Sequence, residues 1–156
     1  MRLRLILSTL FVALGATASI LAGAPDGASA RAKAHQLMSQ GNWKEALTQL
    51  TALATDPEDD PLQAADDMQR ATQCIANLGD YAGFDEFMEK AIAAHAKNPR
   101  VLATASQLYL NTMHNGSVVS GKFERGHHRG GTAKYVDVYA RDRVRALQLL
   151  AQGLPH

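Results

Sequence analysis

Apolar residues between positions 31 and 113 recur every three or four residues, which is the spacing of one face of an α-helix. This pattern predicts five consecutive helices whose apolar faces pack against one another. The residues expected to face inward are, in chain order, Ala34, Leu37 and Met38; Trp43, Ala46, Leu47, Leu50, Leu53 and Ala54; Ala71, Cys74, Ile75 and Leu78; Tyr81, Phe84, Phe87, Met88, Ala91, Ile92 and His95; and Val101, Leu102, Ala105, Leu108 and Tyr109.

Capping residues mark where the predicted helices begin. Asn42 stands three residues before Glu45, the spacing of a capping box, in which each side chain accepts a hydrogen bond from the backbone N–H group of the other residue. Asp60-Pro61 and Asn98-Pro99 each combine an N-cap residue with a proline at the first helical position. Asp80 is expected to open the fourth helix.

Glycine and proline mark the predicted helix ends. Gly41 and Gly79 follow the first and third helices, where a left-handed residue is favoured. The second helix ends before Pro57, because proline disfavours helical geometry in the residue before it. The fifth helix is expected to run to about Met113. The helical region therefore spans residues 31–113.

Two parts of this region are related in sequence. Gly41-Asn42-Trp43 and Gly79-Asp80-Tyr81 share a glycine, a capping residue and an aromatic residue, 38 positions apart. The arrangement resembles the tetratricopeptide repeat, in which an aromatic residue opens the second helix of each hairpin and an alanine marks the close helix crossing. Phe84 stands where that alanine is expected, so the second unit departs from the pattern. A generic array of helical hairpins is the simpler interpretation.

The segment at 114–137 lacks a helical pattern. Glycine is frequent in it, and its few apolar residues allow at most a short β-ribbon or one packed extended strand. We therefore expect an irregular loop rich in Gly, His and Arg. Residues 138–156 predict a C-terminal amphipathic helix. Its expected inward residues are Ala140, Val144, Leu147, Leu150 and Ala151, with Arg141, Arg143 and Arg145 facing water.

Residues 1–30 are typical of a signal peptide. Two early arginines precede a mostly apolar run from Leu5 to Leu21, and Ala28-Ser29-Ala30 offers a small-residue cleavage site. The run is at the short limit for a membrane-spanning helix, which favours cleavage over an uncleaved anchor. Ala24 stands where a lipoprotein needs a cysteine. The pattern predicts export to the periplasm or the extracellular space, with no stable membrane span after cleavage.

The composition excludes several classes of protein. Lys and Arg total 16 and Asp and Glu total 15, so the net charge of +1 predicts no bulk attraction to nucleic acid or anionic membranes. The single cysteine, Cys74, excludes an internal disulfide framework and any centre with several thiolates. It lies on an apolar helical stripe, where a buried, unreactive thiol is expected. No catalytic residue and no cofactor is predicted.

Charge is distributed unevenly along the chain. Residues 31–100 carry seven basic and eleven acidic side chains, whereas residues 122–145 carry seven basic and three acidic ones. The net charge of the chain is near zero because an acidic part and a basic part cancel. This distribution favours a specific or intramolecular contact over bulk attraction.

The basic part contains the candidate interaction residues Arg125, His127, His128 and Arg129. They are expected to pack on the repeats or on a partner. An anion site with two arginines and backbone N–H groups is one alternative. A metal site is another, although no nearby cysteine completes a zinc-binding set.

A longer stretch of the chain resembles a known family. Gly126-His127-His128-Arg129-Gly130-Gly131, then Tyr135-Val136, and then Arg141-Asp142-Arg143-Val144-Arg145-Ala146-Leu147 resemble the N-terminal helical region of bacterial alpha-2-macroglobulin-like proteins. The resemblance covers about residues 40–155. It implies a large exported envelope protein that traps proteases, often through a Cys-Gly-Glu-Gln thioester. Cys74 is followed by Ile75-Ala76-Asn77, so no thioester residue is carried over.

The sequence therefore predicts an all-α fold of tetratricopeptide-like hairpin repeats, with one irregular Gly-rich loop and a C-terminal helix. The expected function is that of an exported, non-catalytic interaction module. Its expected partner is another protein, or the remaining domains of a larger envelope protein. The alternative is a small exported anion- or metal-binding protein that uses the loop at 125–129.

Overall fold

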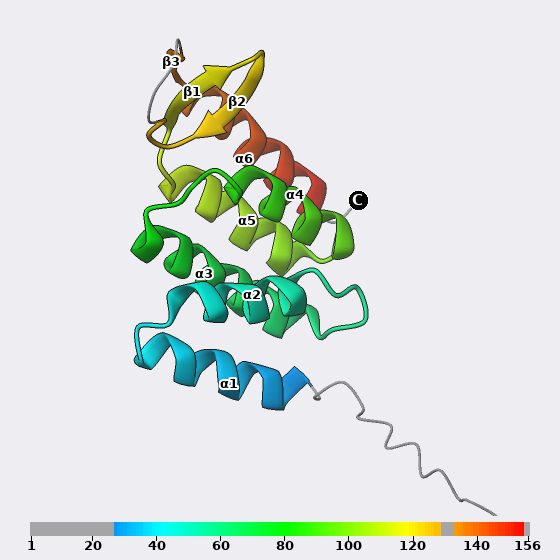
Figure 1. Cartoon of the computed structure of the whole chain (residues 1–156). Helices are drawn as coiled ribbons and strands as arrows, with labels where there is room; N and C mark the ends of the chain where they lie inside the picture. Colours follow the sequence, from blue (N-terminus) through cyan, green and yellow to red (C-terminus); the bar gives the residue numbers. More distant parts are fainter. Residues whose placement is uncertain (1–26, 129–132, 155–156) are drawn as a thin grey trace, which may run out of the picture.

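The computed structural model describes residues 27–128 and 133–154, which form six helices and three strands. The helices follow one another in pairs, and the strands lie between the two helices of the last pair (Figure 1). In chain order the elements are α1 (Gly27–Ser39), α2 (Trp43–Ala54), α3 (Pro61–Leu78), α4 (Phe84–Ala94), α5 (Pro99–Asn111), β1 (Asn115–Val119), β2 (Lys122–Arg125), β3 (Lys134–Asp137) and α6 (Tyr139–Gly153).

The predicted helical character is confirmed, and so are most of the predicted helix ends. The side chains of Asp60 and Asn98 accept hydrogen bonds from the backbone N–H groups at the starts of α3 and α5. Gly41 and Gly79 have φ angles of 77° and 65°, so both adopt the left-handed conformation that glycine permits. These local signals fix the ends of α1 and α3 and the starts of α3 and α5.

One predicted helix start is wrong, and one predicted capping box does not form. α2 begins directly after Asn42, as predicted, but the side chain of Asn42 forms no capping hydrogen bond. Its backbone N–H donates to the carbonyl oxygen of Leu37, which closes the end of α1 and leaves no donor for a capping box. Asp80 does not open α4: its carboxylate accepts from the N–H of Ala82 within a turn, and the helix begins only at Phe84.

The core is built mainly from small and aliphatic side chains contributed by every helix. Cys74 is fully buried within it, as predicted, and burial raises the pKa of its thiol. The largest of the fully buried apolar side chains are Phe84, Leu50, Met68, Met88, Leu102, Leu149 and Val101.

Neighbouring helices stack into an elongated array. α2 packs against α1 and α3, α3 packs against α5, and α5 packs along α6. Figure 1 shows α1 at one end of the array and α6, with the small sheet, at the other. None of the helices in the described part of the chain is both long enough and apolar enough to cross a membrane.

The segment at 114–137 is not the irregular loop that we expected. It contains a three-stranded antiparallel sheet in the order β2-β1-β3, with Gly116 paired with Arg125 and Val136. Ser120 and Gly121 both have positive φ angles, as in the two-residue hairpin turns that match strand twist. The glycines that break a helical pattern thus support a hairpin here.

The predicted inner face of the C-terminal helix is also wrong. The buried residues of α6 are Asp142, Ala146 and Leu149. Val144 and Leu147, which were expected to face inward, are 54% and 62% exposed. The physical reason is that the burial of Asp142, which is paired with arginines, turns the apolar stripe of α6 outward.

The predicted signal peptide falls mostly on residues 1–26, which lie outside the described residues. Residues 27–30 form the first turn of α1, which begins at Gly27 rather than at Arg31. Arg31 forms ion pairs with Asp59 and with the buried Asp67, the latter at 2.8 Å, and so connects α1 to α3 and the loop before it.

Candidate functional site

The sheet brings one arginine into the interior of the helical array. Arg125, the last residue of β2, has a fully buried side chain. Its five N–H groups all donate: two to Asp85, at 2.9 and 2.8 Å, two to Asp142, at 2.7 and 3.0 Å, and one to the carbonyl oxygen of Met113. Both carboxylates are held by two parallel hydrogen bonds, the strongest geometry for this ion pair.

Aromatic rings cover the guanidinium group of Arg125. Its central carbon lies 5.0 Å from the ring centre of Phe84 and 5.7 Å from that of Phe123. Arg141 lies 4.6 Å from the ring centre of Phe123. Such contacts between a cation and an aromatic face are favourable, and they keep water away from Arg125.

Asp142 is the common partner of the cluster. Besides Arg125, it accepts hydrogen bonds from the guanidinium of Arg141 and from Nδ1 of His114, at 2.9 Å. Burial by itself raises the pKa of Asp142, but the hydrogen bonds from Arg125, His114 and Arg141 outweigh it and hold this pKa below its ordinary value. Asp142 is therefore ionised although its side chain has no exposed surface.

A row of polar contacts connects α4 and the turn after it with α6. Arg141 pairs with Asp85 at 2.8 Å, Arg145 pairs with Glu89, and the side chain of Gln152 donates to the carbonyl oxygen of residue 96. All three contacts join residues that are 56 positions apart. The constant separation means that α4 and α6 run parallel and in register. The predicted contact between the acidic and the basic parts of the chain is therefore intramolecular.

Three of the four predicted interaction residues, Arg125, His127 and His128, line one small pocket beside the loop at 79–82. All five side-chain N–H groups of Arg125 donate hydrogen bonds within the buried cluster, so none is left for a ligand. His127 is exposed, and Nδ1 of His128 lies 3.4 Å from the carboxylate of Glu124. Arg129 lies outside the described residues. Within residues 27–128 and 133–154, no group of three His, Cys, Asp or Glu side chains is arranged to hold a metal ion.

Sequence reasoning missed Asp85, His114 and Asp142. One signal was available for Asp142. Trp43 and Tyr81 open their segments three residues before the buried Ala46 and Phe84, and Tyr139 stands three residues before Asp142 in the same way. Asp142 thus occupies a buried crossing position on the last helix, where a charge needs a buried counter-ion.

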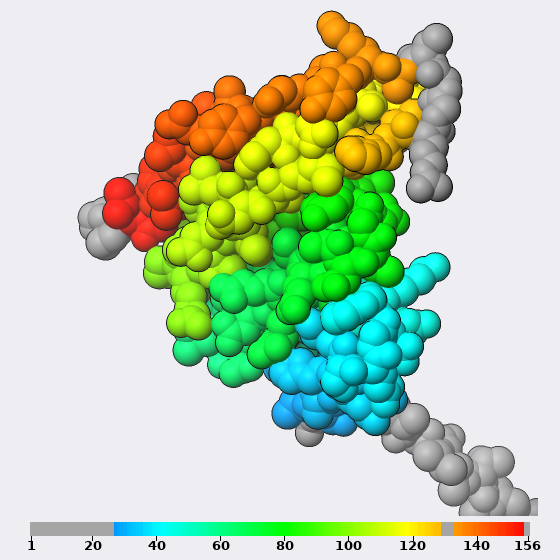
Figure 2. All heavy atoms as spheres, turned by 90° about the vertical axis from the view of Figure 1, so that its left-hand side faces the viewer, coloured from blue at the N-terminus to red at the C-terminus, as the bar shows by residue number. Residues whose placement is uncertain are grey.

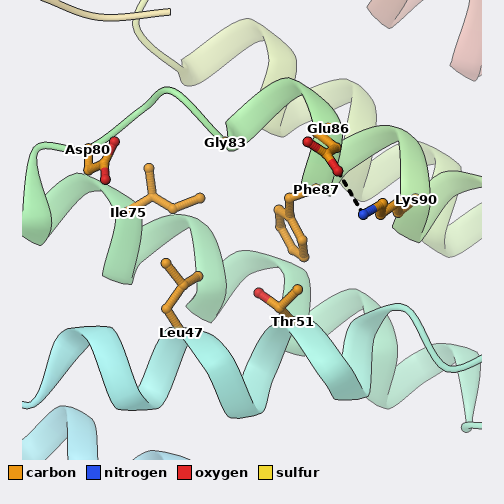
Figure 3. A pocket seen from close by; sticks show the side chains of 8 residues that line it. All are labelled: Leu47, Thr51, Ile75, Asp80, Gly83, Glu86, Phe87 and Lys90. Carbon is orange, nitrogen blue, oxygen red and sulfur yellow. Dashed lines mark ion pairs between the residues drawn. The ribbon is translucent and has the colours of Figure 1, made fainter.

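A groove lies between α2 and α4, over the end of α3 (Figure 3). It has a volume of about 280 Å³. Leu47, Ile75 and Phe87 form its apolar floor, and Glu86 and Lys90 form an exposed ion pair of 2.7 Å at its rim. The full lining is Leu47, Thr51, Ile75, Asp80, Gly83, Glu86, Phe87 and Lys90.

No protein-family model, no curated protein and no solved structure matches this chain. The candidate sites therefore have to be judged from their own geometry.

Proposed function

We propose that this chain is an exported, non-catalytic helical-repeat scaffold that binds a short apolar peptide segment of another protein. The observation that carries the proposal is the groove between α2 and α4. It combines an apolar floor with a charged rim, which is the usual construction of a site that orients a ligand through a few polar groups.

The succession of helices supports a tetratricopeptide-like interpretation. Trp43, Tyr81 and Tyr139 each stand at or just before the start of the second helix of a pair, and a buried residue follows three positions later. Each pair buries its apolar face only against a neighbouring pair, as in other repeat proteins. The sheet replaces the short turn that joins the helices of the third pair.

The rim of the groove indicates the kind of peptide that it accepts. Glu86 and Lys90 neutralise each other, and this pairing lowers the pKa of Glu86. Asp80 is then left as the remaining charge in the lining, and among the described residues its carboxylate accepts a hydrogen bond from one backbone N–H group, at 3.4 Å. We expect peptides with one or two large apolar residues next to a Lys or Arg.

The absence of catalysis is part of the proposal. Arg125 and Asp142, the central pair of the charged cluster, have no exposed side-chain surface. The hydrogen bonds of this cluster join β2 to α4 and α6, which is the arrangement of a structural link. Export rests on the N-terminal sequence pattern, and docking onto a larger alpha-2-macroglobulin-like envelope protein rests on the sequence resemblance.

The test uses a phage-displayed library of short random peptides selected against the protein from residue 27 onward, which keeps all of α1. Thr51→Arg places a long charged side chain in the groove, and Thr48→Arg makes the same change at an exposed position of the same helix. We expect selected peptides to lose at least about tenfold in affinity for Thr51→Arg and to keep their affinity for Thr48→Arg. Failure to select any peptide, or equal loss in both variants, contradicts the proposal.

A further inference from the structure

The outer faces of α1 and α6 differ in polarity, although both helices lie at ends of the array (Figures 1 and 2). The exposed positions of α1 carry only small or polar side chains, among them Lys33, His35, Gln36 and Ser39. A polar outer face of this kind is typical of the terminal helix of a repeat array, because that face contacts water.

The outer face of α6 is apolar. Val144 and Leu147 are more than half exposed. Three other large exposed apolar residues follow or precede them along the chain at intervals of three to five residues. This spacing places them on one side of α6. We call this surface the α6 stripe; it consists of Tyr139, Val144, Leu147, Leu150 and Leu154.

Neither neighbouring helix covers the α6 stripe. α6 packs on α5 through its buried side, which carries Asp142, Ala146 and Leu149. It is joined to α4 through Arg141 and Arg145. Figure 2 shows α6, in orange and red, along the outer edge of the molecule. Large exposed apolar side chains gathered on one side of a helix are typical of an interaction site.

A charged residue, Arg143, lies on the same side of α6 as the stripe and indicates which charge a partner should carry. The guanidinium carbon of Arg143 is 5.7 Å from the ring centre of Tyr139. No carboxylate in the described part of the chain forms an ion pair with Arg143. A second copy of α6 offers no acidic residue either, because the only acid of this helix, Asp142, is buried. The α6 helix of a second copy thus supplies no counter-charge for Arg143, so the charge favours a different partner.

We propose that the α6 stripe binds an amphipathic helix of a partner protein, with leucine-like residues on one face and a carboxylate that pairs with Arg143. Within the array, α2 is covered by α3, the first helix of the following pair. The partner helix takes the corresponding place on α6, in the manner of a helix lying in an apolar groove. This surface is separate from the groove between α2 and α4, and the proposal does not depend on that groove.

The test uses two synthetic helical probes and fluorescence anisotropy. Both probes carry the same leucine face, and they differ only in having Glu or Lys beside it. We expect the Glu probe to bind at least about tenfold more tightly than the Lys probe. Leu147→Glu abolishes this binding, whereas Gln148→Glu, the same change of charge at the adjacent exposed position, preserves it. Arg143→Glu reverses the preference in favour of the Lys probe.

Circular dichroism is used first to check the folding of the variants. We expect each to keep the wild-type helical content and melting temperature, because all three altered side chains are exposed. The proposal is overturned if neither probe binds the wild type or if Leu147→Glu leaves binding intact. It is also overturned if Arg143→Glu fails to change the preference. Sedimentation that reveals a dimer lost in Leu147→Glu overturns it as well, because a second copy then occupies the stripe. Thr51→Arg closes the groove without touching α6, so the two proposals fail independently.

Discussion

Arg125 and Asp142 form a doubly hydrogen-bonded ion pair in which neither side chain is exposed. The pair joins the end of β2 to α6 across 17 residues of sequence. It explains why an aspartate occupies a buried position of α6, and why the sheet lies against α4 and α6.

Removing one partner of this pair is expected to be more harmful than removing both. Arg125→Met leaves Asp142 buried without its main counter-ion and should lower the free energy of unfolding by about 3–5 kcal/mol. The double variant Arg125→Met, Asp142→Leu removes the stranded charge and should recover part of that loss. Urea unfolding of the wild type, both single variants and the double variant measures the effect. A double variant no more stable than Arg125→Met contradicts this explanation.

Two buried carboxylates are expected to change stability with pH in opposite directions. The pKa of Asp142 is lowered on folding, so its stabilisation is present above the unfolded-state pKa and is lost as the pH falls through the folded-state value. Burial raises the pKa of Asp67, although Arg31 opposes the shift, so its contribution falls as the pH rises from the unfolded-state pKa to the folded-state value.

The free energy of unfolding of Asp142→Asn and Asp67→Asn, measured across the acidic range, distinguishes these effects. We expect Asp142→Asn to make stability less dependent on pH below about pH 4, the ordinary range of carboxyl titration. Asp67→Asn should remove a decline in stability that the wild type shows as the pH rises above that range. Identical pH profiles for the two variants would show that at least one of the two assigned directions is wrong.

Gly116 is expected to be required for the position of the sheet. A Cβ atom at this residue would lie 2.2 Å from the carbonyl oxygen of Glu124 and 2.9 Å from the Cα atom of Arg125, so backbone would have to move. Gly116→Ala should therefore destabilise the protein by about 1–3 kcal/mol. Gly83→Ala is the control, because nothing lies near its Cβ position and its φ angle is negative. Thermal unfolding that shows equal effects in the two variants contradicts the observed close approach.

The helices were predictable because their ends are determined locally. Asp60 and Asn98 cap the residues that directly follow them, and Gly41 and Gly79 stop the helices that directly precede them. Such signals require only a few neighbouring residues. The capping box predicted at Asn42 did not form, because the end of α1 and the start of α2 compete for the backbone N–H of Asn42.

The buried cluster was not predictable in the same way. Arg125 meets Asp85 across 40 residues and Asp142 across 17, so no local spacing indicates the contacts. Apolar periodicity also gave the wrong inner face for α6, because it assumes that charged residues face water. A buried charge that is fully paired reverses that assumption, and the apolar side chains of the helix are then exposed.

The most direct test of the scaffold proposal is methyl NMR of the protein from residue 27 onward, titrated with a peptide from the library selection. The proposal predicts that the methyl signals of Leu47 and Ile75, on the groove floor, shift with peptide concentration. It predicts no shift for Val144 and Leu147 on the α6 stripe. Shifts confined to α6, or no shift at Leu47 and Ile75 at saturating peptide, would contradict the proposal that the groove between α2 and α4 is the peptide-binding site.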